Sequence, residues 1–342
     1  MLRTYAARKF LPARRVFRTS RDAKSGVENV FLVVEQDGVC GYGEASPNRY
    51  FDESAEDVHM RLLGLADYLK RQTLNSIHDI HRIWFEAEKL LRPSRAALCA
   101  LDVALWDLWA KLSHSSVSQL LWDEPARPLI TSITLSVPLP EEIDARIEEV
   151  SGFPLVKVKM DSRADLSILR RLLDVGMQRL LVDANASWTA KQCQNLLPQL
   201  KELGVEAVEQ PLPPALNHKM KALLSDSPLP LIADESCAIP EDVERLTGLF
   251  SGVNIKLVKC GGLTPATRLL ESARGCDLKV MVGCMLESSV LISAGLALAQ
   301  KADWADLDGS WLLAQDPFTG PSFQDGILYP QQKPGLGFEL PE

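Results

Sequence analysis

Eight short runs of apolar and β-branched residues recur between residues 129 and 307, and amphipathic helical stretches separate them. This alternation is typical of a parallel sheet, because each parallel strand needs a long crossover before the next one. Eight is also the number of strands that closes a TIM-type barrel. An open doubly wound sheet is the alternative, but no Gly-x-Gly-x-x-Gly motif follows an early strand. The runs are residues 129–137, 155–160, 179–182, 207–209, 231–233, 252–258, 279–282 and 304–307.

The first third of the chain has a different, α+β pattern. Ser54 and Ser94 are typical helix N-caps, and each precedes a stretch of helical periodicity. The first 21 residues carry seven Arg or Lys and no acid, as a transit peptide does, but their alternating apolar residues favour a first strand. We predict a strand hairpin and two helices, over residues 30–35, 39–44, 54–70 and 94–112.

Composition excludes several classes of protein. The net charge of −8 disfavours a nucleic-acid partner. The sequence contains no run of 18 consecutive apolar residues, so we expect no membrane-spanning helix. The seven cysteines form no Cys-x-x-Cys pair, which is typical of a reduced, intracellular protein. We therefore expect a cytoplasmic protein that binds neither nucleic acid nor membrane.

Acidic residues follow three successive barrel strands, at Asp183, Glu209 and Asp234. Their spacings of 26 and 25 residues are each about one strand-helix unit, so the side chains are expected to point into one barrel mouth. Three convergent carboxylates repel one another unless a cation lies between them. A donor set of oxygens alone suits Mg²⁺ better than zinc. Separate helix caps or surface ion pairs are the alternative for any one of these acids.

Lysines occur on the two strands that flank these three in the chain order. Lys157 and Lys159 alternate and therefore share one face of the second strand, while Lys256 lies on the sixth. The alternative is a solvated edge strand, on which two lysines cost little free energy. Beside a metal ion, however, an inward lysine is expected to have a pKa lowered toward neutrality, and it can then act as a general base. Two opposed lysines around a metal suit removal and return of a proton α to a carbonyl group through a stabilised enolate.

The motifs at these positions resemble the enolase superfamily, in its muconate-lactonizing subgroup. In the barrel they are KVK at 157–159, VDAN at 182–185, EQPLP at 209–213, ADES at 233–236, NIK at 254–256, GGL at 261–263 and MVGCM at 281–285. In the first third they are GYGE at 41–44 and ALDVALWD at 100–107. Nearly the whole chain is covered, in order.

The resemblance implies a (β/α)7β TIM-type barrel and a role for each motif. Residues 1–124 would form an α+β capping domain, residues 125–318 the barrel, and residues 319–342 a segment that returns to the cap. The implied roles are Mg²⁺ ligation by Asp183, Glu209 and Asp234, acid/base catalysis by Lys159 and Lys256, electrostatic support of the enolate by Lys157, and contacts to the ligands by Asn185 and Glu235. For Asn185 and Glu235, simple turn chemistry is an equal alternative.

The eighth strand carries Asp306-Leu-Asp308, which resembles the Asp-x-Asp motif of dipeptide epimerases. In that family the two acids receive the α-ammonium of the substrate. Arg21 lies where relatives acting on L-Ala-D/L-Glu place an arginine for the side-chain carboxylate. Glu287 does not fit specificity for an acidic side chain. It would either bind a cationic side chain of the substrate or be a surface acid.

We therefore expect a Mg²⁺-dependent dipeptide epimerase, of the L-Ala-D/L-Glu type, that uses two-lysine proton transfer. One alternative is an o-succinylbenzoate synthase or muconate-type cycloisomerase, whose substrates carry no ammonium. Another is a barrel that has lost catalysis and serves only in binding. The family also implies a homo-oligomer, whose state the sequence leaves open.

Overall fold

Eight parallel strands form the central sheet of the computed structural model, which describes residues 1–20 and 22–340. Neighbours pair in chain order, and the barrel closes where Thr131 and Ser132 bond to Ala305. The strands are β5 (Ile133–Leu135), β6 (Val156–Lys159), β7 (Leu180–Asp183), β8 (Val205–Glu209), β9 (Leu231–Ala233), β10 (Gly252–Lys256), β11 (Lys279–Gly283) and β12 (Trp304–Asp306). The predicted TIM-type barrel is therefore confirmed, and the alternative of an open doubly wound sheet is wrong.

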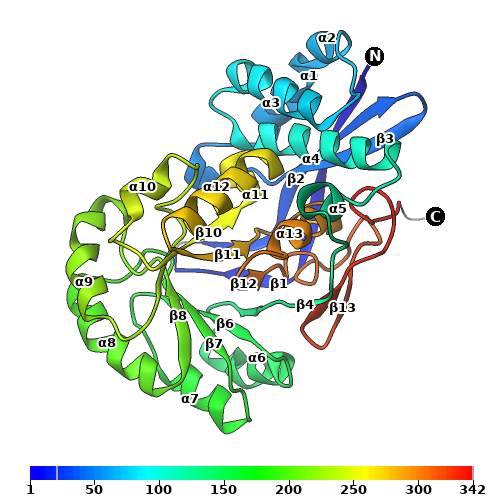
Figure 1. Ribbon diagram of the computed structural model, residues 1–342. Coiled ribbons are helices and arrows are strands. Elements are labelled where there is room, and N and C mark those ends of the chain that lie inside the picture. The colour runs from blue at the N-terminus through cyan, green and yellow to red at the C-terminus, as the bar shows by residue number, and fades with distance from the viewer. Residues whose placement is uncertain (21, 341–342) are drawn as a thin grey trace.

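Helices connect all seven pairs of successive strands and lie outside the barrel (Figure 1). Their inward faces are buried, as in helix α7, whose Leu169 and Leu172 have no exposed surface. They are η2 (Pro140–Glu142), α6 (Ile143–Val150), α7 (Ser167–Asp174), α8 (Ala190–Glu202), η3 (Pro214–Lys219), α9 (Met220–Asp226), α10 (Asp242–Leu246), α11 (Leu257–Cys260), α12 (Leu263–Gly275) and α13 (Ser289–Ala299). Among the helices described, none is both long and apolar enough to cross a membrane.

Two predicted strand boundaries are wrong. The run 129–137 is two strands, because β4 (Leu129–Ile130) leaves the barrel and pairs with β14 (Ile327–Tyr329) near the C-terminus. β14 also pairs with β13 (Ser322–Gln324). The run 252–258 ends early, at Lys256, because helix α11 begins at the next residue.

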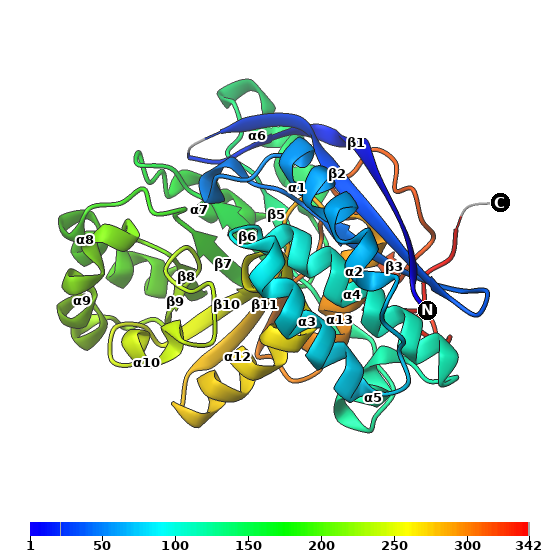
Figure 2. The same ribbon diagram turned by 90° about the horizontal axis from the view of Figure 1, so that it is seen from above.

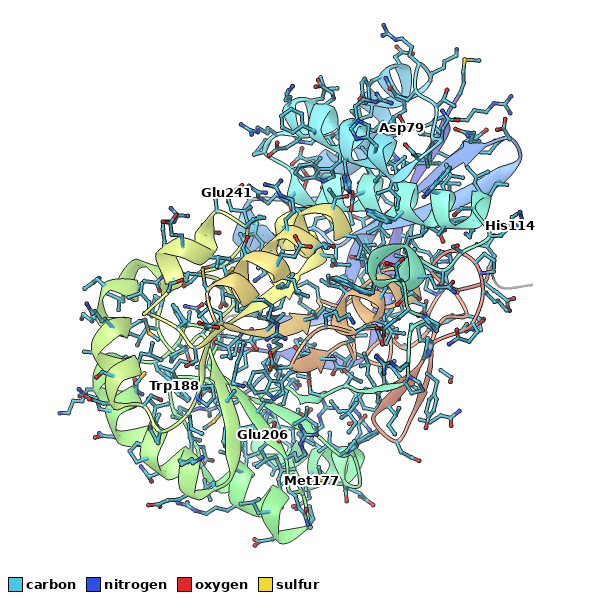
Figure 3. The ribbon with its side chains drawn as sticks, in the orientation of Figure 1. Asp79, His114, Met177, Trp188, Glu206 and Glu241 are labelled. Atoms are coloured by element: carbon cyan, nitrogen blue, oxygen red, sulfur yellow. The ribbon has the colours of Figure 1, made fainter. Side chains whose placement is uncertain are left out.

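The end of the barrel opposite the site is closed by apolar side chains. Leu155, Leu181, Ala207, Ile232 and Met281 form a separate buried cluster, against which Trp304 packs. The Trp304 indole Nε1 donates to Glu206, 3.0 Å away, at the lower part of the barrel in Figure 3. The barrel is therefore a packed core with one open mouth.

The first third of the chain forms the cap as predicted. Its strands β1 (Arg3–Arg18), β2 (Ala23–Gln36) and β3 (Val39–Ala45) make an antiparallel sheet, which includes the expected hairpin and the expected first strand. The Ser54 and Ser94 side chains accept from backbone N–H groups three residues on. The helical elements are η1 (Arg49–Phe51), α1 (Ala55–Gly64), α2 (Ala66–Leu69), α3 (Ile77–Leu91), α4 (Arg95–Leu112) and α5 (Val117–Trp122). The helix predicted over 54–70 is interrupted at Leu65, and helices η1, α3 and α5 were not predicted.

Helix α4 lies between the cap sheet and the barrel. It approaches β3 so closely that a Cβ on Gly43 would collide with the Ala100 carbonyl oxygen. On its other side, Asp102 accepts hydrogen bonds from the Thr264 backbone and hydroxyl at the start of α12. Figure 2, which looks from above, shows the cap elements in front of the barrel strands. The cap is thus held over the mouth by buried polar contacts.

The C-terminal segment contacts the cap. The Phe318 ring packs on Tyr42 and Phe338, and the backbone N–H of Leu336 donates to Asp107 on α4. In Figure 1 this segment lies beside β4 and α5. The domain boundaries at 124 and 318 stay a prediction.

Candidate active site

Polar side chains meet where the barrel strands end. Strand register places Lys159 opposite Asp183 and Asp183 opposite Glu209, so three neighbouring strands deliver charged groups at one height. Asp234 follows β9 directly, and Lys256 is the last residue of β10. The spacing of one strand-helix unit therefore leads to the proximity that the sequence predicts.

Carboxylates and ammonium groups alternate in this cluster. Lys159 Nζ lies 2.5 Å from Asp183 Oδ2, and Lys256 Nζ lies 2.7 Å from Asp234 Oδ2. Lys157 Nζ contacts three acids: Glu209 Oε2 at 2.5 Å, Asp306 Oδ2 at 2.6 Å and Asp183 Oδ2 at 3.4 Å. Each buried charge thus has an opposite charge close by, as burial requires.

Neighbouring polar groups orient the acids. Asn254 Nδ2 donates to Glu209 Oε1 at 2.8 Å, and a Cβ on Gly283 would lie only 2.6 Å from the oxygen of that amide. Asn185 donates to Asp183 through both its backbone N–H and its side chain. Its backbone has a positive φ of 44°, an uncommon conformation outside glycine. Asn185 therefore contacts the Asp183 carboxylate through its backbone and its side chain.

The pKa values follow from burial and from these pairs. Burial alone would raise the pKa of Asp183, but the ammonium groups of Lys159 and Lys157 lower it to about 2. Burial would lower the pKa of Lys256, but the carboxylates of Asp234 and Glu209 raise it above its usual value. The carboxylates around Lys157 likewise raise its pKa well above the usual value. The lowering of a lysine pKa expected beside a bound cation stays a prediction.

A cleft of about 890 Å³ opens above the cluster, between cap and barrel. Lys159 and Lys256 both line it, as do Asp306 and Asp308. Lys157, Asp183 and Glu209 are at most 1% exposed and do not line the cleft. The cap contributes residues 22–28 and 46–51 to its walls. A bound small molecule would thus face two lysines from strands on different sides of the barrel.

The two acids of the eighth strand have different partners. Asp306 is already paired, since Ser132 Oγ donates to Oδ1 at 2.6 Å and Lys157 binds Oδ2. Asp308 accepts from the Thr134 backbone N–H at 2.7 Å. Burial and the charge of Asp306 raise the pKa of Asp308 to about 7. Asp308 is therefore the less compensated of the two acids.

The remaining predicted residues lie in different situations. Arg21 lies outside the described residues. Glu235 lines the cleft directly after Asp234. Glu287 is only 3% exposed and accepts from the Met285 backbone N–H, so the surface-acid interpretation is wrong. Burial and the neighbouring Glu44 raise the pKa of Glu287 to about 8.

Sequence reasoning missed two residues of the cluster. Lys259 is buried and binds Asp234 Oδ1 at 2.6 Å. Gln210 Oε1 accepts from the backbone N–H of Asp234 and of Ser236. For Lys259, only its place three residues after Lys256 pointed to the site. For Gln210, only its place directly after Glu209 pointed to the site.

Asp183, Glu209 and Asp234 are the candidate ligands of a divalent cation. Within the described ranges, no three His, Cys, Asp or Glu side chains surround one point as a ready metal site, because lysine ammonium groups stand between the acids. Glu209 Oε2 is buried, and the Lys157 ammonium lies 2.5 Å from it. Three acids that offer oxygen donors alone fit a hard cation such as Mg²⁺.

Comparisons with known proteins cover nearly the whole chain. The model of the mandelate racemase / muconate lactonizing enzyme N-terminal domain matches residues 3–122, and the enolase C-terminal domain-like model matches residues 141–342. An L-Ala-D/L-amino acid epimerase of Flavobacterium johnsoniae is 34% identical over 330 residues, covering 96% of this chain and 97% of the relative. The L-Ala-D/L-Glu epimerase of Escherichia coli is 33% identical, covering 93% and 96%. The crystal structure of a Methylococcus capsulatus dipeptide epimerase, complexed with Mg and L-Arg-D-Lys, has a TM-score of 0.89 and 32% identity, covering 98% of each chain.

Proposed function

The chain belongs to the mandelate racemase / muconate lactonizing enzyme family of the enolase superfamily, and we propose that it is a Mg²⁺-dependent dipeptide epimerase. All three relatives reported above are named epimerases, and one of them holds Mg and a dipeptide. The reaction inverts an amino-acid α-carbon, so the enzyme is an isomerase. The synthase and cycloisomerase alternative has no support among these relatives.

The observation that carries this proposal is the placement of Lys159 and Lys256. They come from β6 and β10, four strands apart, and both line the same cleft between cap and barrel. An α-carbon held between them would present its hydrogen to one lysine and its opposite face to the other. One neutral amine removes the proton, and the other lysine, as ammonium, returns a proton to the opposite face. Atoms and charge balance, since one proton is taken up and one is released.

Asp183, Glu209 and Asp234 would hold the Mg²⁺. When bound, the cation would stabilise negative charge on the substrate carboxylate as the α-proton leaves. Lys157 lies within 3.4 Å of Asp183 and contacts Glu209 and Asp306, so its charge supports the same region. Asn185 contacts Asp183 and keeps it oriented. Burial beneath the cleft excludes water from these groups and strengthens their electrostatic effect.

Asp308, together with Asp306, would receive the substrate's α-ammonium. Both line the cleft beside Lys159. L-Ala-D/L-Glu is the proposed substrate, with the side-chain carboxylate met by Arg21. The seven free cysteines favour a cytoplasmic enzyme, and we expect a homo-oligomer.

Exchange of the α-proton in D₂O tests this function directly. The wild-type protein with Mg²⁺ is incubated with a panel of dipeptides whose second residue is acidic, cationic or apolar. Loss of the α-proton signal and appearance of the second isomer are followed by NMR. Exchange with at least one dipeptide is expected. Absence of exchange across the panel, alongside conversion of an ammonium-free cycloisomerase or synthase substrate, would overturn the proposal.

A further inference from the structure

We propose that Lys259 is a positioning residue, which holds the carboxylate of Asp234 in place for Lys256. This inference rests on the proposed two-lysine function, and it adds that the two faces of the substrate depend on different supporting residues. Lys259 lies on α11, just after Lys256, and its side chain is only 2% exposed.

The Lys259 ammonium is surrounded by oxygen atoms. It lies 2.6 Å from Asp234 Oδ1, 2.7 Å from the Asp234 carbonyl, 2.9 Å from the Cys237 carbonyl and 3.0 Å from the Asn254 carbonyl. An ammonium has three N–H donors, so all of them have acceptors here. These acceptors lie on β10, at the end of β9 and in the loop that follows β9. Lys259 therefore ties the segment that carries Asp234 to the strand that carries Lys256.

The two oxygens of Asp234 have different lysine partners. Oδ1 binds Lys259 and Oδ2 binds Lys256, at 2.6 and 2.7 Å. The next nearest acid to Lys256 is Glu209, at 3.9 Å. The orientation of the Asp234 carboxylate consequently sets where the Lys256 amine rests.

Lys159 does not share this arrangement. Its close acid is Asp183, at 2.5 Å, and Asp183 contacts Lys157 rather than Lys259. Loss of the Lys259 ammonium should therefore misplace Lys256 more than Lys159. The consequence is a difference between the two isomers of one substrate, because each isomer gives its proton to a different lysine. A purely structural lysine would produce no such difference.

The test compares α-proton exchange from both isomers of one dipeptide in Lys259→Met, which keeps the length of the side chain and removes its charge. Lys256→Ala and Lys159→Ala first assign each isomer to its lysine. We expect Lys259→Met to slow exchange from the Lys256-dependent isomer about tenfold more than exchange from the other, as loss of one charge-assisted contact implies. The effect should lie mainly in kcat rather than in KM.

Lys111→Met is the matched control. Lys111 Nζ also binds a buried aspartate and a backbone carbonyl, Asp107 at 2.6 Å and Cys40 at 3.0 Å, but in the cap. It should lower the melting temperature without separating the two isomers. If Lys259→Met does not fold, Lys259→Gln, which keeps an amide donor, is measured in the same way, and Lys259→Ala is measured with added methylammonium, which should restore the isomer ratio.

Equal slowing of both isomers, or no slowing of either, would overturn the role proposed for Lys259. A failure of the proposed function looks different, because the wild-type protein would then exchange no α-proton from either isomer.

Discussion

Lys157 Nζ on the second barrel strand lies 2.6 Å from Asp306 Oδ2 on the eighth, across the line where the barrel closes. This ion pair spans residues 149 positions apart in the chain. Because Ser132 donates to the other oxygen, Oδ1, both carboxylate oxygens of Asp306 have partners. Asp308 is therefore the acid of this strand that is more available to a substrate. The first prediction follows from that difference.

Asp308→Asn removes a charge but keeps the shape of the side chain. If Asp308 meets the substrate's α-ammonium, kcat/KM for a free-amine dipeptide should fall roughly ten- to a hundredfold. An N-acetylated dipeptide should be a poor substrate of the wild type and lose little more in the variant. Asp306→Asn should instead slow both substrates, because it also frees Lys157. Equal turnover of acetylated and free dipeptides by the wild type would count against the dipeptide site.

Removal of divalent cations should abolish activity. Asp183, Glu209 and Asp234 offer oxygen donors only, so Mg²⁺ should restore turnover after chelation. The measurement is α-proton exchange after exhaustive dialysis against a chelator, followed by titration with Mg²⁺. Full activity in the metal-free protein would contradict the metal assignment.

Lys159→Ala and Lys256→Ala should each reduce epimerisation by roughly 10²- to 10⁴-fold or more, the usual contribution of a positioned general base. Each variant should still exchange the α-proton of the isomer that faces the remaining lysine. Proton exchange and epimerisation are therefore measured separately. If both variants exchange both isomers at the wild-type rate, the two-base scheme is wrong.

Gly283→Ala should weaken the site through Asn254. The added Cβ would lie 2.6 Å from Asn254 Oδ1, and Asn254 Nδ2 is the donor to Glu209. Overpacking of this kind costs about 1–3 kcal/mol of stability. Mg²⁺ affinity, measured by calorimetry, should fall along with the melting temperature. Unchanged Mg²⁺ affinity would show that Asn254 does not orient Glu209.

Asp102 predicts a pH dependence of stability. Burial raises its pKa in the folded protein to about 7, from an ordinary value of 3.8, although hydrogen bonds from Thr264 oppose this. The folded state therefore favours the protonated acid, whose stabilising contribution is complete below pH 4 and is lost as the pH rises to 7. That loss amounts to at most about 4 kcal/mol.

Asp102→Asn resembles the protonated acid, so it should remove this decline in stability between pH 4 and 7. Urea unfolding of both proteins at several pH values checks the expectation. At pH 8 the variant should be at least as stable as the wild type. Parallel stability curves for the two proteins would contradict the raised pKa.

Much of the fold could be predicted because it depends on local pattern. Alternation of apolar runs with helical stretches requires crossovers, and crossovers of this length produce parallel strands. Ser54 and Ser94 mark helix starts because a hydroxyl caps free N–H groups, which is also a local effect. The run 129–137 was misjudged, since its first part pairs with β14, about 200 residues away. Nothing within that run indicates its distant partner.

The sequence by itself determined that Asp183, Glu209 and Asp234 come to one end of the barrel, because strand-end residues one unit apart lie on adjacent strands. It also determined that Lys157 and Lys159 share a face, through the two-residue period of a strand. Only the tertiary structure decided which acid each lysine contacts, that Lys157 engages Asp306, and that Lys259 holds Asp234. Those pairings depend on barrel closure and on side-chain direction in a buried space, where every charge must find a partner within a few ångströms. Residue spacing along the chain carries no record of those distances.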